Sequence, residues 1–245
     1  MCGFLQRIKT RYCFEPGLRR PTRSCRRNDG SQTVLVDVHR RLFVGLSISS
    51  LASAQLASRP AEEWSKTLEQ PSRIEGLKIA EIVAKLQLKP GQTVADLGAG
   101  TGVFSVPMAK AVAPAGRVYA VEIDEGYFPM ILGKAKEVSL SNVRTVRGEF
   151  TDPKLPAQDV DLAFMHDVLH HIDDRAGYLK STARYLKQDG RFVVIDFKAD
   201  QGPHKEQPNL VVSEAQVTGW MKAVGLNRVQ AIDLFPDKYF LVFSR

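Results

Sequence analysis

The chain has 245 residues, of which 44% are hydrophobic and 25% are charged, so it is long enough to bury one sizeable core beside a smaller appendage. Its net charge of +7 suggests nucleic-acid binding, but residues 1–41 hold ten Lys and Arg against three Asp and Glu, and residues 42–245 hold twenty-four of each. The body is therefore electroneutral, and its charge gives no reason to expect nucleic acid as a partner.

Residues 1–54 are predicted to form a basic arm, and residues 55–245 a single globular domain. The arm is rich in Arg and has no sustained hydrophobic period, so we expect it to be disordered. All three cysteines, Cys2, Cys13 and Cys25, lie in the arm. The cysteine-free body offers them no partner for a structural disulfide or a thiolate metal site.

A signal-like stretch lies near residues 40–54. Arg40 and Arg41 precede about ten apolar residues and the ending Ala52-Ser53-Ala54, which are the three parts of a secretory signal. The stretch is too short to span a bilayer as a helix. An export signal read from a later start codon, an Arg-rich transit peptide and a linker helix remain open. We expect a cytoplasmic protein, with export to the periplasm as the alternative.

Beyond Pro60 the pattern becomes that of a globular domain. Ser72 and Glu75 match a capping box ahead of apolar positions at helical spacing, which predicts one helix that ends before Pro90. The apolar run at 94–97 predicts a short buried strand, and a glycine-rich turn then leads into a predicted helix at about 103–112.

The glycine-rich turn follows the pattern D-x-G-x-G-x-G, starting at Asp96. A dinucleotide-binding G-x-G-x-x-G would need a third glycine where Val103 stands, and the sequence has no G-x-x-x-x-G-K-[ST] phosphate loop. A strand, a glycine turn and a helix still favour a ligand site, because glycines let the backbone approach a bound molecule. The N-terminus of the following helix suits an anionic group.

Six further strands and three helices are predicted after the turn. Strands at 117–122, 143–147, 160–165 and 191–197 alternate with helices at 124–137, 175–187 and 213–224, which predicts parallel pairing through right-handed crossovers. The second of these helices is expected to stop at Gly190, and the third to begin at Ser213 beside the acid Glu214. The strands at 228–234 and 239–243 are too close for a crossover helix and predict an antiparallel hairpin.

Three features occur in order: the D-x-G-x-G-x-G turn, the carboxylate Glu122 at the end of the next strand, and Gly148-Glu149-Phe150 after the strand that follows. Together they resemble the class I S-adenosylmethionine-dependent methyltransferases, most closely the ubiquinone and menaquinone C-methyltransferase-like group, over about residues 72–245. The resemblance implies a Rossmann-like, doubly wound α/β fold, with a mostly parallel seven-stranded sheet and an antiparallel C-terminal hairpin strand.

The resemblance also implies S-adenosylmethionine as the cofactor. Glu122 would accept hydrogen bonds from both ribose hydroxyls, and Glu149 would accept one from the adenine amino group. The cofactor-binding residues that it implies are Asp96, Gly98, Ala99, Gly100, Gly102, Glu122, Ile123, Glu149, Phe150 and His166.

A polar cluster, His166 to His171, follows the fourth predicted strand, at the edge where open α/β sheets bind ligands. His166, Asp167 and His170 are the candidate catalytic residues, and His204 is a further candidate base for an acceptor that must lose a proton. We expect at most one of His170 and His171 to face the pocket. Packing or capping roles remain open for all of them. No metal site is expected, because this spacing does not guarantee converging ligands.

These features imply methyl transfer from S-adenosylmethionine to a small-molecule acceptor by in-line displacement, because the sulfonium already makes the methyl group electrophilic. The alternatives are a non-catalytic S-adenosylmethionine-binding regulatory protein and an NAD-dependent oxidoreductase, which Val103 opposes. We expect no nucleic-acid partner and no membrane span. The acceptor, the methylated atom and the oligomeric state stay open.

Overall fold

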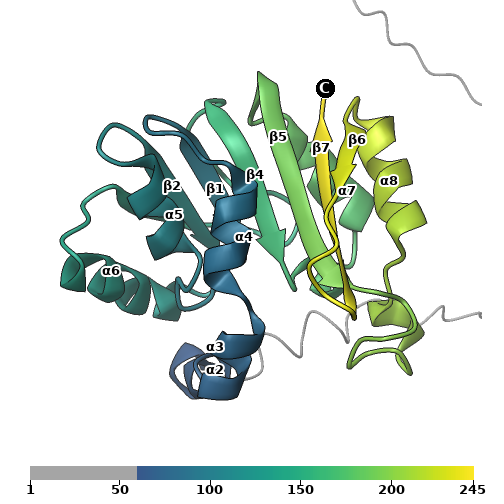
Figure 1. Ribbon diagram of the computed structural model, residues 1–245, viewed down its shortest axis with the longest axis horizontal. Coiled ribbons are helices and arrows are strands. Elements are labelled where there is room, and N and C mark those ends of the chain that lie inside the picture. Colours follow the sequence, from purple (N-terminus) through teal and green to yellow (C-terminus); the bar gives the residue numbers. More distant parts are fainter. Residues whose placement is uncertain (1–59) are drawn as a thin grey trace, which may run out of the picture. The chain divides into compact units, whose positions relative to one another are not determined.

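The computed structural model describes residues 60–245, which fold around a seven-stranded sheet (Figure 1). The strand order is β3-β2-β1-β4-β5-β7-β6. Strands β1 to β5 pair in parallel, whereas β7 runs antiparallel to both β5 and β6. The predicted Rossmann-like sheet with an antiparallel C-terminal hairpin is therefore confirmed. The strands are β1 (Thr93–Leu97), β2 (Arg117–Glu122), β3 (Val143–Arg147), β4 (Val160–His166), β5 (Leu186–Phe197), β6 (Asn227–Ala231) and β7 (Lys238–Ser244).

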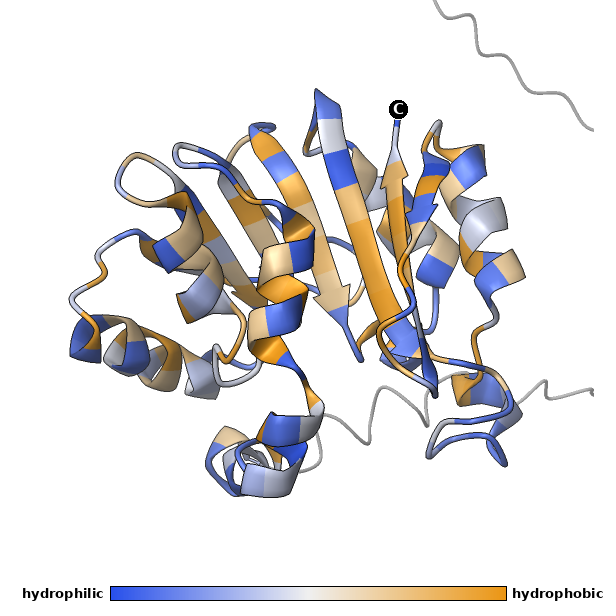
Figure 2. Ribbon diagram, in the orientation of Figure 1, coloured by the Kyte–Doolittle hydropathy of each residue, from blue (hydrophilic) through white to orange (hydrophobic). Residues whose placement is uncertain are grey.

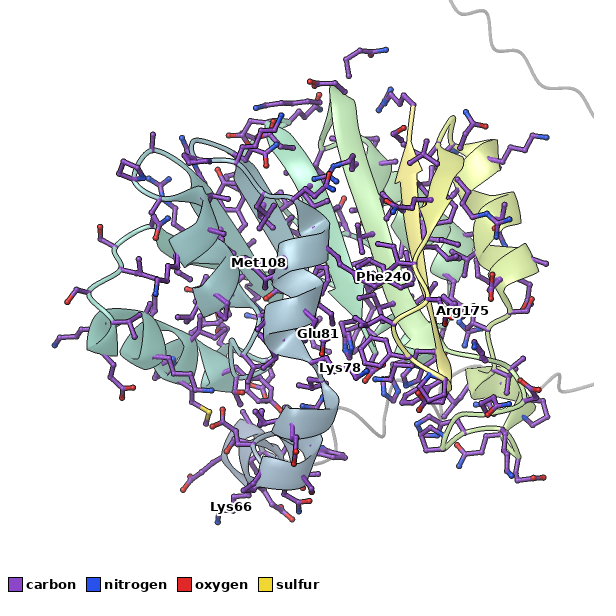
Figure 3. The ribbon with its side chains drawn as sticks, viewed as in Figure 1. Lys66, Lys78, Glu81, Met108, Arg175 and Phe240 are labelled. Carbon is purple, nitrogen blue, oxygen red and sulfur yellow. The ribbon has the colours of Figure 1, made fainter. Side chains whose placement is uncertain are left out.

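Helices cover both faces of the sheet, as a doubly wound fold requires. One face carries α4 (Ile79–Leu86), α5 (Ser105–Val112) and α6 (Phe128–Glu137), and the other carries α7 (Arg175–Ala183) and α8 (Glu214–Ala223) (Figure 1). The first apolar layer includes Met108 of α5 and Phe240 of β7, which are labelled in Figure 3. Because both faces are covered, β4 is hydrophobic along most of its length and β5 along its second half (Figure 2).

The order of the strands reverses between β1 and β4. After β1 the chain builds β2 and β3 on one side, and then returns to β4 on the other side of β1. The carboxyl ends of β1 and β4 therefore form the switch point at which open α/β sheets bind ligands. Two short helices, α2 (Ala61–Leu68) and α3 (Pro71–Gly76), lie at this end of the sheet (Figure 1). The 3-10 turns are η1 (Glu125–Tyr127), η2 (Leu169–His171) and η3 (Pro208–Leu210).

The predicted helix from Ser72 to Pro90 is in fact two helices. Helix α3 begins after Gln70 and has no side-chain cap, so the predicted capping box is wrong. Lys78 adopts a left-handed conformation with a φ of 50°, which redirects the chain between α3 and α4. Its Nζ donates to the carbonyl oxygen of Leu234 at 3.1 Å. A contact with a residue so distant in the sequence leaves no signal in the local pattern.

The predicted end of the helix at 175–187 is also wrong. Helix α7 stops at Ala183, and Leu186 already pairs with Val160 of β4. Gly190 lies inside β5 and does not end a helix. On either side of it, β5 pairs with β4 at Leu186 and at Arg191. In α8, Ser213 is the N-cap as predicted, but its capping-box partner is Gln216 and not Glu214.

The predictions for the arm at 1–54, its cysteines, its signal-like stretch and the domain boundary at residue 55 lie outside the described residues. Over residues 60–245, no helix has both the length and the apolar composition needed to cross a bilayer.

Candidate cofactor and acceptor site

The glycine turn begins where β1 ends. Gly98, Gly100 and Gly102 adopt φ angles of 70°, 53° and 82°, which side-chain-bearing residues rarely adopt. A Cβ at Gly98 would lie 2.5 Å from Cγ2 of Val168, so the turn packs directly against the segment after β4. The turn is also tied to β2, because the N–H groups of Gly98 and Ala99 donate to the carbonyl oxygen of Val121 at 2.9 and 3.0 Å.

Glu122, at the end of β2, holds the other side of the turn. The N–H of Gly100 donates to its Oε1 at 2.8 Å, and the N–H of Ile123 donates to its Oε2 at 2.9 Å. Burial raises the pKa of Glu122, and the backbone donors oppose this rise by favouring the charged form. A carboxylate offers about four lone-pair sites, and the backbone donors do not fill them all, so Glu122 can still accept from a ligand hydroxyl.

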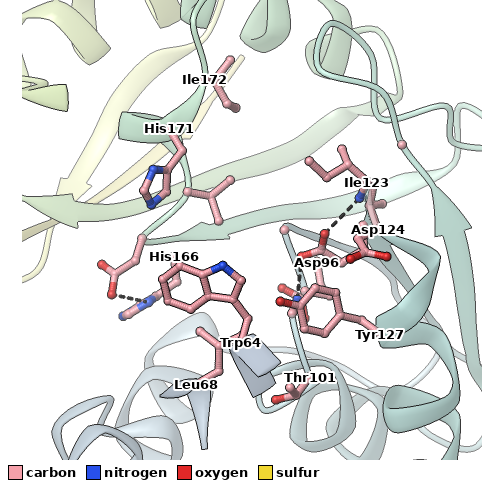
Figure 4. A pocket seen from close by; sticks show the side chains of 18 of the residues that line it. Trp64, Leu68, Asp96, Thr101, Ile123, Asp124, Tyr127, His166, His171 and Ile172 are labelled. Atoms are coloured by element: carbon pink, nitrogen blue, oxygen red, sulfur yellow. Dashed lines mark hydrogen bonds and ion pairs between the residues drawn. The ribbon is translucent and has the colours of Figure 1, made fainter. Parts of the chain in front are cut away.

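A cavity of about 800 Å³ lies at the carboxyl ends of β1, β2 and β4, a volume typical of small-molecule sites. Trp64 and Leu68 reach it from α2, Tyr127 from η1, and His166 and His171 from the segment that ends β4 and forms η2 (Figure 4). Nine of the ten predicted cofactor-binding residues line this cavity: Asp96, Gly98, Ala99, Gly100, Glu122, Ile123, Glu149, Phe150 and His166.

Gly102 is the tenth, and it does not line the cavity. A Cβ there would lie 3.2 Å from Cγ1 of Ile131, so the absence of a side chain serves packing against α6. Glu149 and Phe150 belong to the exposed rim: Glu149 pairs with Lys154 at 3.3 Å, and Phe150 is 46% exposed. The turn and Glu122 thus lie deeper than the residues predicted to contact adenine.

Asp96 is buried beneath the glycine turn. It accepts a hydrogen bond from Oγ of Ser105, the first residue of α5, at 2.5 Å. Burial raises the pKa of Asp96 to about 7, the bond from Ser105 opposes the rise, and the nearby charge of Glu122 adds to it. The carboxyl group is therefore costly to ionise in the folded protein until a cation approaches it.

Asp96→Asn should make stability less sensitive to pH. The pKa of Asp96 is raised to about 7 in the folded protein from an ordinary 3.8, so the native state binds the proton more tightly and loses stability as the pH rises between these values. The difference in the free energy of unfolding, variant minus parent, should therefore be about 3 kcal/mol larger at pH 8 than at pH 5. Urea titrations of both ligand-free proteins at the two pH values measure this difference. An equal difference at both would contradict the raised pKa.

His166 is the last residue of β4 and Asp167 follows it, and both are buried or nearly so. The His166 ring lies 4.9 Å from the Phe104 ring and 6.5 Å from that of Phe164, and burial lowers its pKa to about 4. Asp167 adopts a φ of 56° and pairs through Oδ2 with Lys238 Nζ at 2.7 Å. Burial raises the pKa of Asp167, but His166 and Lys238 outweigh it and hold the pKa below its usual value. Near neutral pH, His166 is uncharged and Asp167 is committed to an ion pair.

His170 belongs to a group of three imidazoles at the other end of the cavity. Its Nδ1 lies 2.6 Å from Oδ1 of the buried Asp196, at the end of β5. The rings of His171 and His204 lie 4.0 and 5.0 Å from its own. His170, His171 and His204 all line the cavity, so the expectation that at most one of His170 and His171 faces the pocket is wrong. The 3-10 turn η2 places both rings on the same side.

Sequence reasoning missed two partners of the predicted residues. The sequence places Lys238 in the connection between the predicted strands at 228–234 and 239–243, yet it is the first residue of β7 and is only 9% exposed. Asp196 falls in the predicted strand at 191–197 with no partner predicted for it, yet it is 1% exposed and binds His170. A charged residue next to an apolar run is the only hint in the sequence that either side chain is buried. The pairing of Lys238 with Asp167 and of Asp196 with His170 depends on how the folded segments meet.

Residues 95–194 match the model of a methyltransferase domain. Demethylmenaquinone methyltransferase from Geobacillus sp. (strain WCH70) is 24% identical over 116 residues, which cover 47% of this chain and 50% of that protein. The chain thus spans about half the length of the curated relatives it matches.

Solved structures share the fold. A SAM-dependent methyltransferase from Aquifex aeolicus is 27% identical, with a TM-score of 0.64, and the match covers 73% of this chain and 95% of that one. The 1,6-didemethyltoxoflavin-N1-methyltransferase of Burkholderia thailandensis, solved with 1,6-didemethyltoxoflavin and S-adenosylhomocysteine, is 20% identical, with a TM-score of 0.58. That match covers 78% of this chain and 85% of the other.

Proposed function

We propose that this chain, which belongs to the class I S-adenosylmethionine-dependent methyltransferases through its domain at residues 95–194, transfers a methyl group from S-adenosylmethionine to a small-molecule acceptor. One observation carries the proposal. A single cavity joins the glycine turn and Glu122 at one end to His170, His171 and His204 at the other. A cofactor and an acceptor can therefore meet inside it.

The first end suits the cofactor. The carboxylate of Glu122 accepts from the ribose hydroxyls, in charge-assisted bonds that are stronger than neutral ones. The N-terminus of α5, just after the glycine turn, carries the positive end of the helix dipole, which favours the methionine carboxylate. Glu122 gives this end a negative character, and an approaching sulfonium or ammonium group favours the ionised form of Asp96 beside it.

The second end suits the acceptor. His170, His171 and His204 line it with the apolar side chains of Phe197 and Leu210. His170 is the predicted catalytic residue that we assign to the acceptor. We assign His166, uncharged and packed among aromatic rings, to the wall between the two ends. Asp167 holds that wall in place through Lys238, and its ion pair makes it a poor base.

Methyl transfer from a sulfonium requires no covalent bond between the protein and either reactant. The sulfonium supplies an activated methyl group, and the chain's task is to hold the acceptor in line with the C–S bond at about 3–3.5 Å. One similar protein is named demethylmenaquinone methyltransferase, and one protein of the same fold was solved with 1,6-didemethyltoxoflavin and S-adenosylhomocysteine bound. A cavity of about 800 Å³ has room for a cofactor and an acceptor of modest size.

Calorimetry followed by a turnover assay tests the proposal. S-adenosylmethionine and S-adenosylhomocysteine should each bind once per chain, whereas NADH should give no saturable heat. Tritium should then pass from the labelled methyl group to at least one member of a panel of phenols, quinols and amines. Saturable binding of NADH alone would reverse the assignment. Cofactor binding without transfer to any acceptor would favour the non-catalytic, regulatory alternative.

A further inference from the structure

We propose that His170, His171 and His204 form a binding site for a divalent transition-metal ion of the Zn²⁺ class, and that this ion binds an oxygen atom of the methyl acceptor. The second half rests on the proposed function, because it needs an acceptor in the same cavity. Each histidine offers one nitrogen ligand, and these atoms all lie within 4.8 Å of one another. Among residues 60–245, no other group of three His, Cys, Asp or Glu side chains converges in this way.

The three rings come from two segments on opposite sides of the cavity end. His170 and His171 lie on η2, and His204 lies on the connection between β5 and η3. The His170 and His204 ring centroids are 5.0 Å apart, and those of His171 and His204 are 5.8 Å apart. Nitrogen atoms around a tetrahedral zinc ion, bound at about 2.0–2.1 Å, lie roughly 3.4 Å apart. Movements of about 1 Å, mainly of the His204 connection, would bring the nitrogens to this spacing.

Asp196 prepares one ligand for the ion. A carboxylate only accepts hydrogen bonds, so the short contact to His170 Nδ1 places the proton on Nδ1 and leaves the Nε2 lone pair available. The N–H groups of His170 and Phe197 donate to Asp196 at 3.1 and 2.8 Å, which fixes the carboxylate in turn. A buried carboxylate behind an imidazole is the arrangement that orients metal-binding histidines in proteins.

His204 adds a second indication of a ligand. Its Nδ1 atom is buried and lacks a well-formed hydrogen bond within residues 60–245, where Gln207 is a side-chain hydrogen-bonding neighbour of the ring. A buried polar atom without a partner costs free energy, and coordination of a cation would remove that cost. Imidazole nitrogens select zinc and its neighbours in the first transition row over Mg²⁺ or Ca²⁺, which prefer oxygen.

Three protein ligands leave one position of a tetrahedral ion open, as in catalytic zinc sites. The three histidines line the acceptor end of the cavity, so a phenol or alcohol oxygen of the acceptor fills that position. The ion lowers the pKa of the bound hydroxyl, which loses its proton to water. The oxygen then attacks the methyl carbon, the new O–C bond forms as the S–C bond breaks, and the sulfonium leaves as a neutral thioether. The inferred substrate class is hydroxylated small molecules that are methylated on oxygen.

Cobalt titration tests the site, because tetrahedral Co²⁺ absorbs visible light and reports its ligands. The full chain should carry Cys→Ser changes at Cys2, Cys13 and Cys25, so that no thiolate contributes. One Co²⁺ should bind per chain and be displaced by Zn²⁺. His204→Ala should weaken binding at least 100-fold and Asp196→Asn by 10- to 100-fold, while the exposed neighbour change Lys205→Ala should leave it unaltered. No stoichiometric Co²⁺ binding, or equal binding by His204→Ala, would overturn the site.

Two further measurements distinguish a failure of the metal-site proposal from a failure of the methyltransferase proposal. S-adenosylhomocysteine should bind His204→Ala as tightly as the parent, because the cofactor end is unchanged. Chelation should abolish transfer to a phenolic acceptor, and added Zn²⁺ should restore it. Cofactor binding and full turnover in chelated protein would overturn the metal's role and leave the methyltransferase proposal intact. Cobalt binding without cofactor binding would overturn the methyltransferase proposal and the metal's role in binding the acceptor. It would leave the three-histidine metal site in place.

Discussion

Glu122→Ala should weaken the binding of S-adenosylmethionine by about 100- to 1,000-fold. The change removes both acceptors for the ribose hydroxyls, and each charge-assisted hydrogen bond contributes about 1.5–3 kcal/mol. It also leaves the N–H groups of Gly100 and Ile123 without the partners that shape the glycine turn. Calorimetric titration with S-adenosylmethionine, and with S-adenosylhomocysteine where turnover interferes, measures the loss.

Two variants control for this result. Glu122→Gln keeps one acceptor oxygen at nearly the same volume and should lose only about tenfold, because a neutral amide replaces the charged acceptor. Glu137→Ala removes an exposed carboxylate at the end of α6 and should not change the affinity. Unchanged affinity in Glu122→Ala, with a native fold by circular dichroism, would remove Glu122 from the ribose role.

Lys238→Met should lower the free energy of unfolding by about 3–5 kcal/mol, the usual cost of leaving one partner of a buried ion pair alone. Lys238 Nζ pairs with Asp167 Oδ2 at 2.7 Å and lies 4.5 Å from the centroid of the Phe197 ring. The side chains of both ion-pair partners are largely buried, so water does not replace the lost contact. Urea titration at pH 7 measures the change.

A double variant shows whether the stability is lost because the Asp167 charge has no partner or because Lys238 no longer packs. Asp167→Asn removes the charge, and asparagine tolerates the positive φ at this position. Combined with Lys238→Met, it should recover most of the lost stability. Lys66→Met, on the exposed surface of α2 (Figure 3), should change stability by less than about 0.5 kcal/mol. A loss in the double variant as large as in Lys238→Met alone would show that packing, and not the charge, is responsible.

The sheet was predictable from the sequence because its signals are local. The central parallel strands β1, β2 and β4 are short apolar runs bounded by glycine or by polar residues, and the connection between the last two strands is too short for a crossover. The glycine turn and Glu122 were predictable for a related reason. Their chemistry follows from residue type and spacing along one β-α-β unit, and the structure places both beside one cavity.

The parts that were missed depend on distant segments. The break at Lys78 and the early start of β5 arise from contacts with Leu234 and with β4, far away in the sequence. The grouping of His204 with His170 and His171 needs the β5–η3 connection to fold back over η2, and the pattern around His204 gives no sign of this. Hydrophobic periodicity and residue propensity predict single helices and strands. These features instead depend on contacts between elements that are far apart in the sequence.

The position of β7 between β5 and β6 also affects how the chain folds during synthesis. Strand β6 leaves the ribosome first, yet its ladder within the described sheet is formed with β7 alone. Until residues 238–244 emerge, β6 has no neighbour in the sheet and Asp167 lacks its cation. The nascent chain therefore exposes an open edge at β5 until its final strand inserts, an interval in which chaperones or mispairing compete with correct folding.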